Sequence, residues 1–189
     1  MRHRKSGRKL GRNPNHQRAL LKSLASALFL TEKPEEMYAD KDPRPKKPGR
    51  IVTTLHKAKE VRPLVEKCVT IARKAQKHIR EADTLKTSAA RGTDQWRQWR
   101  NSAQWQQWNK AIAPAVAMRR RIIQLLGNKD AATVLLDIIG PRFESRNGGY
   151  TRILKLATPR LGDAGARAIL EFVGQNDRHK EKAVSLPIE

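Results

Sequence analysis

Few residues of the kinds that build disulfide, metal or catalytic sites occur in this sequence. Cys68 is the single cysteine among 189 residues, so it forms neither an internal disulfide nor a cysteine-based zinc site. The five histidines are scattered, and no two have the spacing of metal ligands. No dinucleotide-binding motif and no phosphate-binding P-loop is present. We therefore expect no catalytic residues, no metal, no cofactor and no small-molecule substrate.

Acidic residues are also scarce, and they suggest no acid–base site. Most of the 18 acids fall at helix ends, in a proline-rich segment or among basic residues. Glu66 and His56 can be drawn as an acid–base pair, but a solvated helix face is the interpretation that we adopt for Glu66.

Long apolar runs are missing as well. The most apolar stretches, residues 19–30 and 134–139, are too short to span a bilayer. The first 12 residues contain no apolar run, which excludes a secretory signal peptide. They are rich in Arg and free of acids, as mitochondrial transit peptides are, but they lack an apolar helical face. We expect no membrane partner and a cytoplasmic location.

Positive charge is what the sequence has in excess. Lys and Arg total 40 against 18 acids, which gives a formal net charge of +22. This charge must coat a surface, and such a surface repels itself unless a polyanion neutralises it. The hydrophobic fraction of 38% predicts a small core. Nucleic acid is the leading partner on these grounds, and an anionic membrane surface is the runner-up.

The first half of the chain alternates between basic, helical and proline-rich segments. Residues 1–12 form a basic arm that cannot fold alone and would become ordered between RNA phosphates. Asn13 and Pro14 suit the start of a first helix with a leucine stripe on one side. Residues 31–50 read as a linker, and residues 51–53 as a short strand. Thr54 is the expected N-cap of a second helix, with a kink or a late start near Pro63.

The second half predicts two more helices and a hairpin. A third helix is expected over residues 115–126, followed by a C-cap at Gly127. A fourth starts with Asp130 as N-cap and is ended by Gly140 and Pro141. Residues 150–156 and 167–173 alternate like strands and are expected to form a long antiparallel hairpin.

These elements predict an α+β fold with a basic N-terminal arm. About four core helices would pack on a small sheet that includes the C-terminal β-hairpin. We expect a single domain over residues 13–173, with insertions at about 31–50 and 79–113. Residues 174–189 are polar and are expected to be a disordered tail.

All four tryptophans lie within the insertion at 79–113. They stand at positions 96, 99, 105 and 108, in an imperfect repeat with an offset of nine residues. The segment is expected to be a helix clamped on two sides or two short turns. Packing of the indoles on protein is the favoured interpretation because interfaces favour Trp. Stacking on bases, aided by the neighbouring arginines, stays open.

The segment 142–150 has the composition of an RNA-binding loop. It combines cations with Gly148 and Gly149, which let a backbone approach phosphates closely, and Arg side chains that can bind phosphate in bidentate fashion. Tyr150 could stack on a base or pack under the loop. Arg152 and Lys155 would extend in opposite directions from an ideal strand.

Several motifs together resemble a known family. The chain begins with MRHRKSGRKL (residues 1–10) and carries NGGYTRILKL at residues 147–156. Between them, residues 50–54, 58–63 and 140–143 follow in the same order, and residues 168–173 fit a final strand. The sequence is similar on these segments to the bacterial family of large-subunit ribosomal protein seventeen.

The resemblance implies a function and a set of RNA contacts. It implies an α+β domain in the cytoplasmic ribosome that binds and stabilises large-subunit ribosomal RNA near the exit-tunnel side, beside neighbouring large-subunit proteins and without catalytic activity or a cofactor. Because the family signature begins at Met1, a bacterial ribosome is favoured over a mitochondrial one. The implied RNA-contacting residues are Arg2, His3, Arg4, Lys5, Arg8, Lys9 and Arg12 in the arm, and Arg142, Arg146, Asn147, Tyr150 and Arg152 in the loop and hairpin.

The insertions and the tail exceed the family pattern. We interpret them as lineage-specific extensions that reach neighbouring RNA or proteins, because they fall between core elements without changing their order. Two other functions remain as alternatives, a free-standing protein that coats DNA and an RNA-processing enzyme. The ordered motifs disfavour the first, and the missing catalytic constellation disfavours the second.

Overall fold

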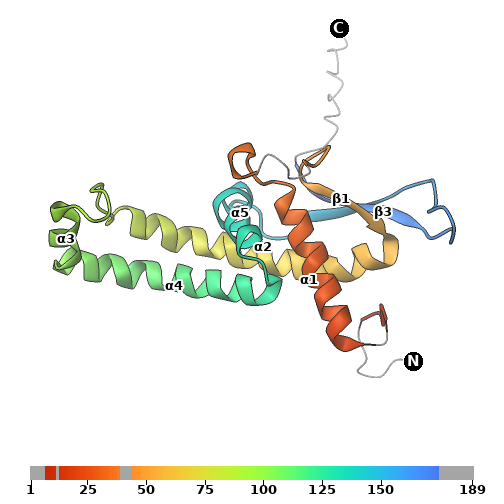
Figure 1. Ribbon diagram of the computed structural model, residues 1–189, viewed down its shortest axis with the longest axis horizontal. Helices are drawn as coiled ribbons and strands as arrows, with labels where there is room; N and C mark the ends of the chain where they lie inside the picture. Colours follow the sequence, from red (N-terminus) through yellow and green to blue (C-terminus); the bar gives the residue numbers. More distant parts are fainter. Residues whose placement is uncertain (1–6, 12, 39–43, 175–189) are drawn as a thin grey trace, which may run out of the picture.

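A long antiparallel helical hairpin and a small sheet dominate the structure (Figure 1). The computed structural model describes residues 7–11, 13–38 and 44–174. The rest of the arm, and residues 175–189 of the predicted disordered tail 174–189, lie outside the described residues. The hairpin consists of α2 (Leu55–Asp83) and α4 (Ala103–Leu126), which run side by side. Helix α1 (Pro14–Leu30) crosses α2 near the sheet.

The sheet has three antiparallel strands in the order β1-β3-β2. They are β1 (Arg50–Thr54), β2 (Thr151–Lys155) and β3 (Arg167–Phe172), so the predicted first strand and the predicted hairpin are both present. Ile51, Leu170 and Ile153 lie in one row across the sheet. They belong to the face that packs on the core beside α2. The predicted α+β fold is confirmed.

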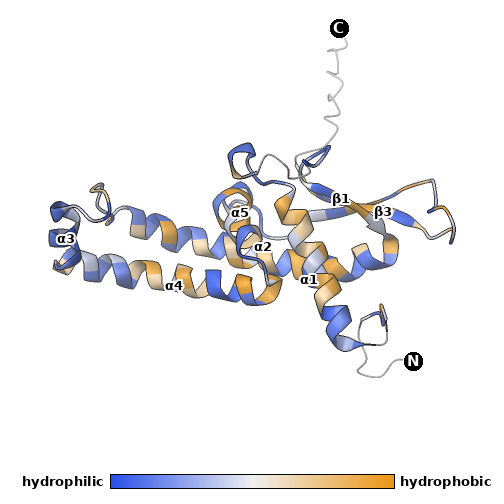
Figure 2. Cartoon of the chain, in the orientation of Figure 1, coloured by the Kyte–Doolittle hydropathy of each residue, from blue (hydrophilic) through white to orange (hydrophobic). Residues whose placement is uncertain are grey.

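The hydrophobic core lies where α1, α2, the second half of α4, residues 131–143 and the sheet meet. Phe172 of β3 stacks on Phe29 of α1, with 6.1 Å between ring centroids, and also contacts Phe143 at 5.9 Å. Cys68 of α2 is fully buried in this cluster, and burial raises the pKa of its thiol to about 12. Figure 2 shows hydrophobic positions gathered here and mainly hydrophilic ones around α3 at the other end of the hairpin.

Local capping agrees with the sequence at some helix ends and departs from it at others. The side chain of Asn13 accepts a hydrogen bond from the Asn15 amide (2.8 Å), which caps α1 as predicted. Gly127 ends α4 with a left-handed φ of 73°, also as predicted. The next helix, however, is capped by Asn128, whose side chain accepts from the Ala131 amide at 2.9 Å. The prediction of Asp130 as N-cap was therefore wrong by two residues.

The prediction that the fourth helix ends at Gly140 and Pro141 was also wrong. Three segments follow one another without a break, α5 (Lys129–Val134), the π-helical η2 (Leu135–Ile139) and α6 (Gly140–Arg142). Pro141 occupies a first-turn position of α6, where its missing N–H costs no helical hydrogen bond. The wider π turn that precedes α6 lets this new helical segment begin without interrupting the helix.

Gly140 is required for the close packing of this helix on α2. A Cβ atom added to it would lie 2.6 Å from Nε2 of Gln76 and 3.4 Å from the carbonyl oxygen of Ala72. The same Gln76 Nε2 donates a hydrogen bond to the carbonyl of Leu136 at 2.7 Å. Gly140 is therefore a packing position of a continuous helix and not its end.

Both long helices contain a proline. Thr54 is the N-cap of α2, as predicted, whereas α4 begins earlier than predicted. Helix α2 begins at Leu55 and continues through Pro63, so of the two alternatives considered near Pro63, a kink or a late start, the late start is wrong. Its first turn is fixed from outside, because the Leu55 amide donates to the carbonyl of Ala166 at 2.9 Å. Helix α4 begins at Ala103, well before residue 115, and continues through Pro114. Packing of the two helices against each other outweighs the local penalty of each proline.

The predicted insertions take different forms. In the first, a 3-10 turn, η1 (Glu35–Met37), follows α1, and residues 39–43 lie outside the described residues. The second comprises the distal ends of α2 and α4 and the short helix α3 (Asp94–Arg100) between them. Trp96 and Trp99 therefore lie on α3, and Trp105 and Trp108 on α4. The expectation of one helix or two short turns was wrong, because the segment forms two successive helices.

Deleting residues 81–111 should leave the remaining domain folded, as the interpretation of this segment as an insertion requires. The aromatic cluster of Phe29, Phe143 and Phe172 lies at the other end of the hairpin. We expect a shortened chain that unfolds cooperatively in urea, with a smaller m-value because less surface is exposed on unfolding. A deletion variant without native secondary structure in circular dichroism would contradict this view of the segment.

Candidate nucleic-acid interface

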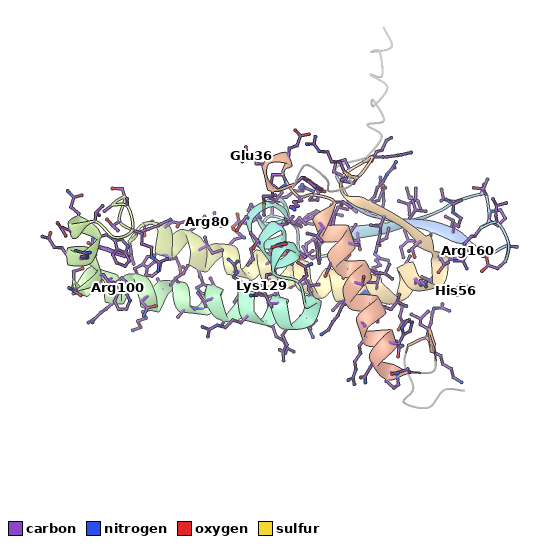
Figure 3. The ribbon with its side chains drawn as sticks, viewed as in Figure 1. Glu36, His56, Arg80, Arg100, Lys129 and Arg160 are labelled. Carbon is purple, nitrogen blue, oxygen red and sulfur yellow. The ribbon has the colours of Figure 1, made fainter. Side chains whose placement is uncertain are left out.

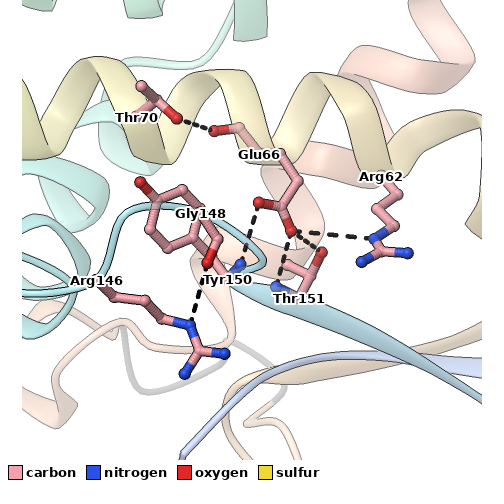
Figure 4. Close-up of polar contacts among 7 residues, drawn as sticks. All are labelled: Arg62, Glu66, Thr70, Arg146, Gly148, Tyr150 and Thr151. Carbon is pink, nitrogen blue, oxygen red and sulfur yellow. Dashed lines mark hydrogen bonds and ion pairs between the residues drawn. The ribbon is translucent and has the colours of Figure 1, made fainter.

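The loop between α6 and β2 is attached to α2 through one carboxylate. Glu66 of α2 accepts hydrogen bonds from the backbone amides of Tyr150 (3.1 Å) and Thr151 (2.8 Å) and from the Thr151 hydroxyl (2.5 Å). The Nε of Arg62, one turn earlier, lies 4.0 Å from the same carboxylate (Figure 4). Backbone donors at the start of β2 are thus satisfied by a side chain, and the loop is fixed relative to α2.

A second attachment lies two turns further along α2. The guanidinium of Arg73 donates to the carbonyl oxygen of Arg146 at 2.9 Å and also to the side-chain oxygen of Asn147. Gly148 and Gly149 then adopt φ angles of 132° and 61°. In both, a Cβ atom would meet no other atom within 4 Å, so the backbone there is open to an approaching ligand. The Arg146 Nε donates to the Gly148 carbonyl at 3.2 Å, which lays that side chain along the loop.

Cations surround the attached loop. On one side, a hollow of about 390 Å³ is lined by Arg73, Lys74, Lys77, His78, Met118 and Glu144. On the other, a hollow of similar volume is lined by Arg142, Phe143, Ser145, Arg146, Val173 and Gly174. Lys74, Lys77 and Arg146 are exposed. Glu144 is paired with Arg80, so it neutralises part of the charge on the first side.

Two of the predicted RNA contacts are held by buried acids of the chain itself. Arg142 forms a bidentate pair with Glu32, at 2.8 and 3.1 Å, in which the Glu32 side chain is 5% exposed. Arg152 of β2 pairs with Glu171 of β3 at 2.6 Å, and that glutamate is 1% exposed. About a third of each arginine side chain is still exposed. Both arginines therefore anchor structure, and each keeps part of its surface for a partner.

Of the two positions considered for Tyr150, stacked on a base or packed under the loop, the structure has the second. Its side chain is 1% exposed, and its ring lies 5.2 Å from that of Phe143. The ring packs under the loop and is not open to a stacking base. Its predicted role as an RNA contact is therefore corrected, because the strand start places this side chain on the core face.

The described part of the basic arm lies apart from the loop, at the start of α1 (Figure 1). The carbonyl of Arg8 accepts a hydrogen bond from Gln17 of α1 at 2.5 Å, and Lys9 is exposed. Gly7 lies close to Glu60 of α2. The other predicted arm contacts, Arg2, His3, Arg4, Lys5 and Arg12, lie outside the described residues.

Other kinds of site find little support in the described ranges. No group of three His, Cys, Asp or Glu side chains in them could hold a metal ion. None of the helices there is long and apolar enough to cross a bilayer. Basic side chains are spread over the molecule, with Arg80 and Arg100 on the hairpin, Lys129 at the start of α5 and Arg160 beyond β2 (Figure 3).

Comparison with known proteins points to one family. The model of the ribosomal protein L17 family matches residues 46–173. The large ribosomal subunit protein bL17 of Rhodopirellula baltica is 57% identical over 178 residues, 94% of this chain and 83% of that protein. The proteins of the same name from Bradyrhizobium diazoefficiens and Allorhizobium ampelinum are 34% and 32% identical, over 93% and 92% of this chain and 86% and 82% of their own lengths.

The chain belongs to the ribosomal protein L17 family. The resemblance inferred from the motifs is thereby confirmed. The family match includes the loop, α2 and the whole sheet, whereas the basic arm lies before its first matched residue.

The residues that attach the loop of this L17 family member differ from those predicted to contact RNA. Glu66 was interpreted as part of a solvated helix face, yet it binds two backbone amides and a hydroxyl. Arg73, Lys74 and Lys77 were not singled out at all. Lys74 and Lys77 follow Arg73 by one and four residues, a spacing that places the three cations on one side of α2. This spacing is the sequence feature that could have identified them.

Replacing Glu66 with Gln should destabilise the fold by about 1–3 kcal/mol, because a neutral amide cannot accept all three hydrogen bonds that the carboxylate accepts. Urea unfolding of the two proteins measures the difference. Glu81→Gln is the matched control, since the Glu81 side chain is half exposed and its carboxylate lies 3.9 Å from the Lys77 ammonium nitrogen. This substitution should reduce the stability by less than about 1 kcal/mol. Equal losses in the two variants would show that Glu66 has no special role.

Proposed function

We propose that this protein binds and stabilises large-subunit ribosomal RNA through the loop 142–149 and the adjoining basic face of α2. The observation that carries the proposal is the attachment of the glycine loop to α2 by Glu66 and Arg73, with Lys74, Lys77 and Arg146 exposed around it. A cationic surface of fixed shape suits RNA, which proteins recognise largely by shape and backbone contacts. The role is structural and not catalytic.

Family membership supports the general setting of this proposal. Proteins of the ribosomal protein L17 family are structural constituents of the ribosome, and the relatives are named as bacterial large-subunit proteins. The chain is accordingly assigned to the large subunit of the cytoplasmic ribosome. A position near the exit-tunnel side, and contacts with neighbouring large-subunit proteins, are further parts of the proposal.

The net charge of +22 explains why the protein needs its RNA partner. In the attached loop, open backbone at Gly148 and Gly149 can approach phosphates, while Arg146 can bind them. The exposed parts of Arg142 and Arg152 extend this surface to both ends of the loop. In the arm, Arg8 and Lys9 provide a second basic surface at the start of α1, and Arg2, His3, Arg4, Lys5 and Arg12 complete the proposed set.

Binding of the full chain to protein-free large-subunit RNA should weaken steeply with salt. Replacing Lys74, Lys77 and Arg146 together with Gln should reduce the slope of log affinity against log salt by roughly two units, since each lost phosphate contact removes about 0.7–0.9. Filter binding at several salt concentrations measures the slope.

A charge-preserving variant is the control for this experiment. Exchanging Lys74 and Lys77 for Arg, and Arg146 for Lys, should leave the slope close to that of the parent chain. An unchanged slope in a folded Gln variant would contradict the assignment of this surface. Equal affinity for random duplex DNA, with no sedimentation alongside large subunits, would instead favour a DNA-coating protein.

A further inference from the structure

The distal end of the helical hairpin is a separate surface that the proposed function leaves unused. Residues 84–110 comprise the turn after α2, helix α3 and the first two turns of α4, and they project away from the sheet and the loop (Figure 1). We call these residues the hairpin tip. Arg100, at the end of α3, lies at the extremity of the molecule (Figure 3).

The hairpin tip is cationic and rich in free amide side chains. Asp94 is its single acid, and its cations are Lys86, Arg91, Arg97, Arg100 and Lys110. Seven exposed amides accompany them, at positions 95, 98, 101, 104, 106, 107 and 109. None of these seven side chains hydrogen-bonds to any part of the chain that the structure describes. The surface thus presents positive charge together with donors and acceptors that are available to a partner.

The Arg100 side chain contacts two indole rings. Its guanidinium carbon lies 5.1 Å from the ring centroid of Trp96, on α3, and 6.0 Å from that of Trp105, on α4. Cation–π contacts with both rings restrict this side chain, while its guanidinium N–H groups donate to no acceptor in the part of the chain that the structure describes. Arg100 is exposed, whereas both rings are half buried. Arg97 differs, because it is paired with Asp94 at 3.2 Å.

The other two tryptophans contact each other across α3 and α4. Trp99 of α3 and Trp108 of α4 meet edge to face, with 5.6 Å between their centroids. The Trp99 indole nitrogen is buried. The four tryptophans thus have two tasks: Trp99 and Trp108 join α3 to α4, while Trp96 and Trp105 hold the guanidinium.

We propose that the hairpin tip is a second RNA-binding surface, in which Arg100 binds phosphate or a base edge while Trp96 and Trp105 offer ring surface to a base. The charge balance of five cations to one acid selects an anionic partner. A guanidinium that contacts two rings and has amides around it is suited to bind RNA. It is less suited to bind an apolar surface of another protein. This inference rests on the proposed function only in assuming that ribosomal RNA is the polyanion at hand.

Tryptophan emission offers a direct test, since all four tryptophans lie in the hairpin tip. The full chain is titrated with protein-free large-subunit RNA, and binding is followed independently by filter retention. We expect quenching and a shift of the emission over the same RNA concentrations that retain the chain. Retention without any change in emission would overturn the inference and leave the proposed function intact. An emission change that appears only when other large-subunit proteins are added would overturn it in favour of a protein partner.

Two substitutions that each remove one positive charge separate the role of the Arg100 guanidinium from the effect of net charge. Arg100→Gln should weaken the RNA affinity about tenfold, as expected for a lost charge-assisted contact, and should reduce the emission change. Arg97→Gln removes the same charge one turn away and should alter the affinity less than about twofold, because that guanidinium is already paired. Equal effects of the two substitutions in folded proteins would mean that only net charge matters and would overturn the role of Arg100.

Discussion

The hydrogen bonds of the Glu66 carboxylate are the link on which the arrangement of helices, sheet and loop depends. They tie the middle of α2 to the backbone at the start of β2, where the chain passes from the loop into the sheet. With that junction fixed, Tyr150 is directed into the core against Phe143, and the glycines before it remain at the surface. One half-buried acid therefore separates the part of the segment 146–156 that builds the fold from the part that faces outward.

Other scarce acids have similar tasks in this basic chain. Glu32 and Glu171 are both buried, and each holds one arginine of the predicted RNA-binding set. Such placement counters the self-repulsion of a chain with a net charge of +22 at the junctions where helices and strands meet. The remaining cations stay exposed, which is the distribution that an RNA-binding protein requires.

The sequence predicted what depends on local pattern. The strand at residues 51–53 follows from a β-branched run and those at 150–156 and 167–173 from alternation, while the cap at Asn13 follows from side-chain chemistry. Predictions from the sequence were wrong where tertiary packing overrides local preference, as at Pro63 and Gly140, which lie inside continuous helices. At the candidate site, charge and glycine content identified the loop, but no local pattern could show that Glu66 and Arg73 meet it from more than seventy residues away.

A density map of the assembled large subunit that contains this protein tests the central claim most directly. The account predicts that RNA phosphates lie within hydrogen-bonding distance of Arg146 and of Lys74 or Lys77, on the face of α2 that carries the loop. It also predicts that Glu66 keeps its contacts with the start of β2 in the bound state. A map in which the loop and this face of α2 point to solvent, while other surfaces bind the RNA, would contradict it.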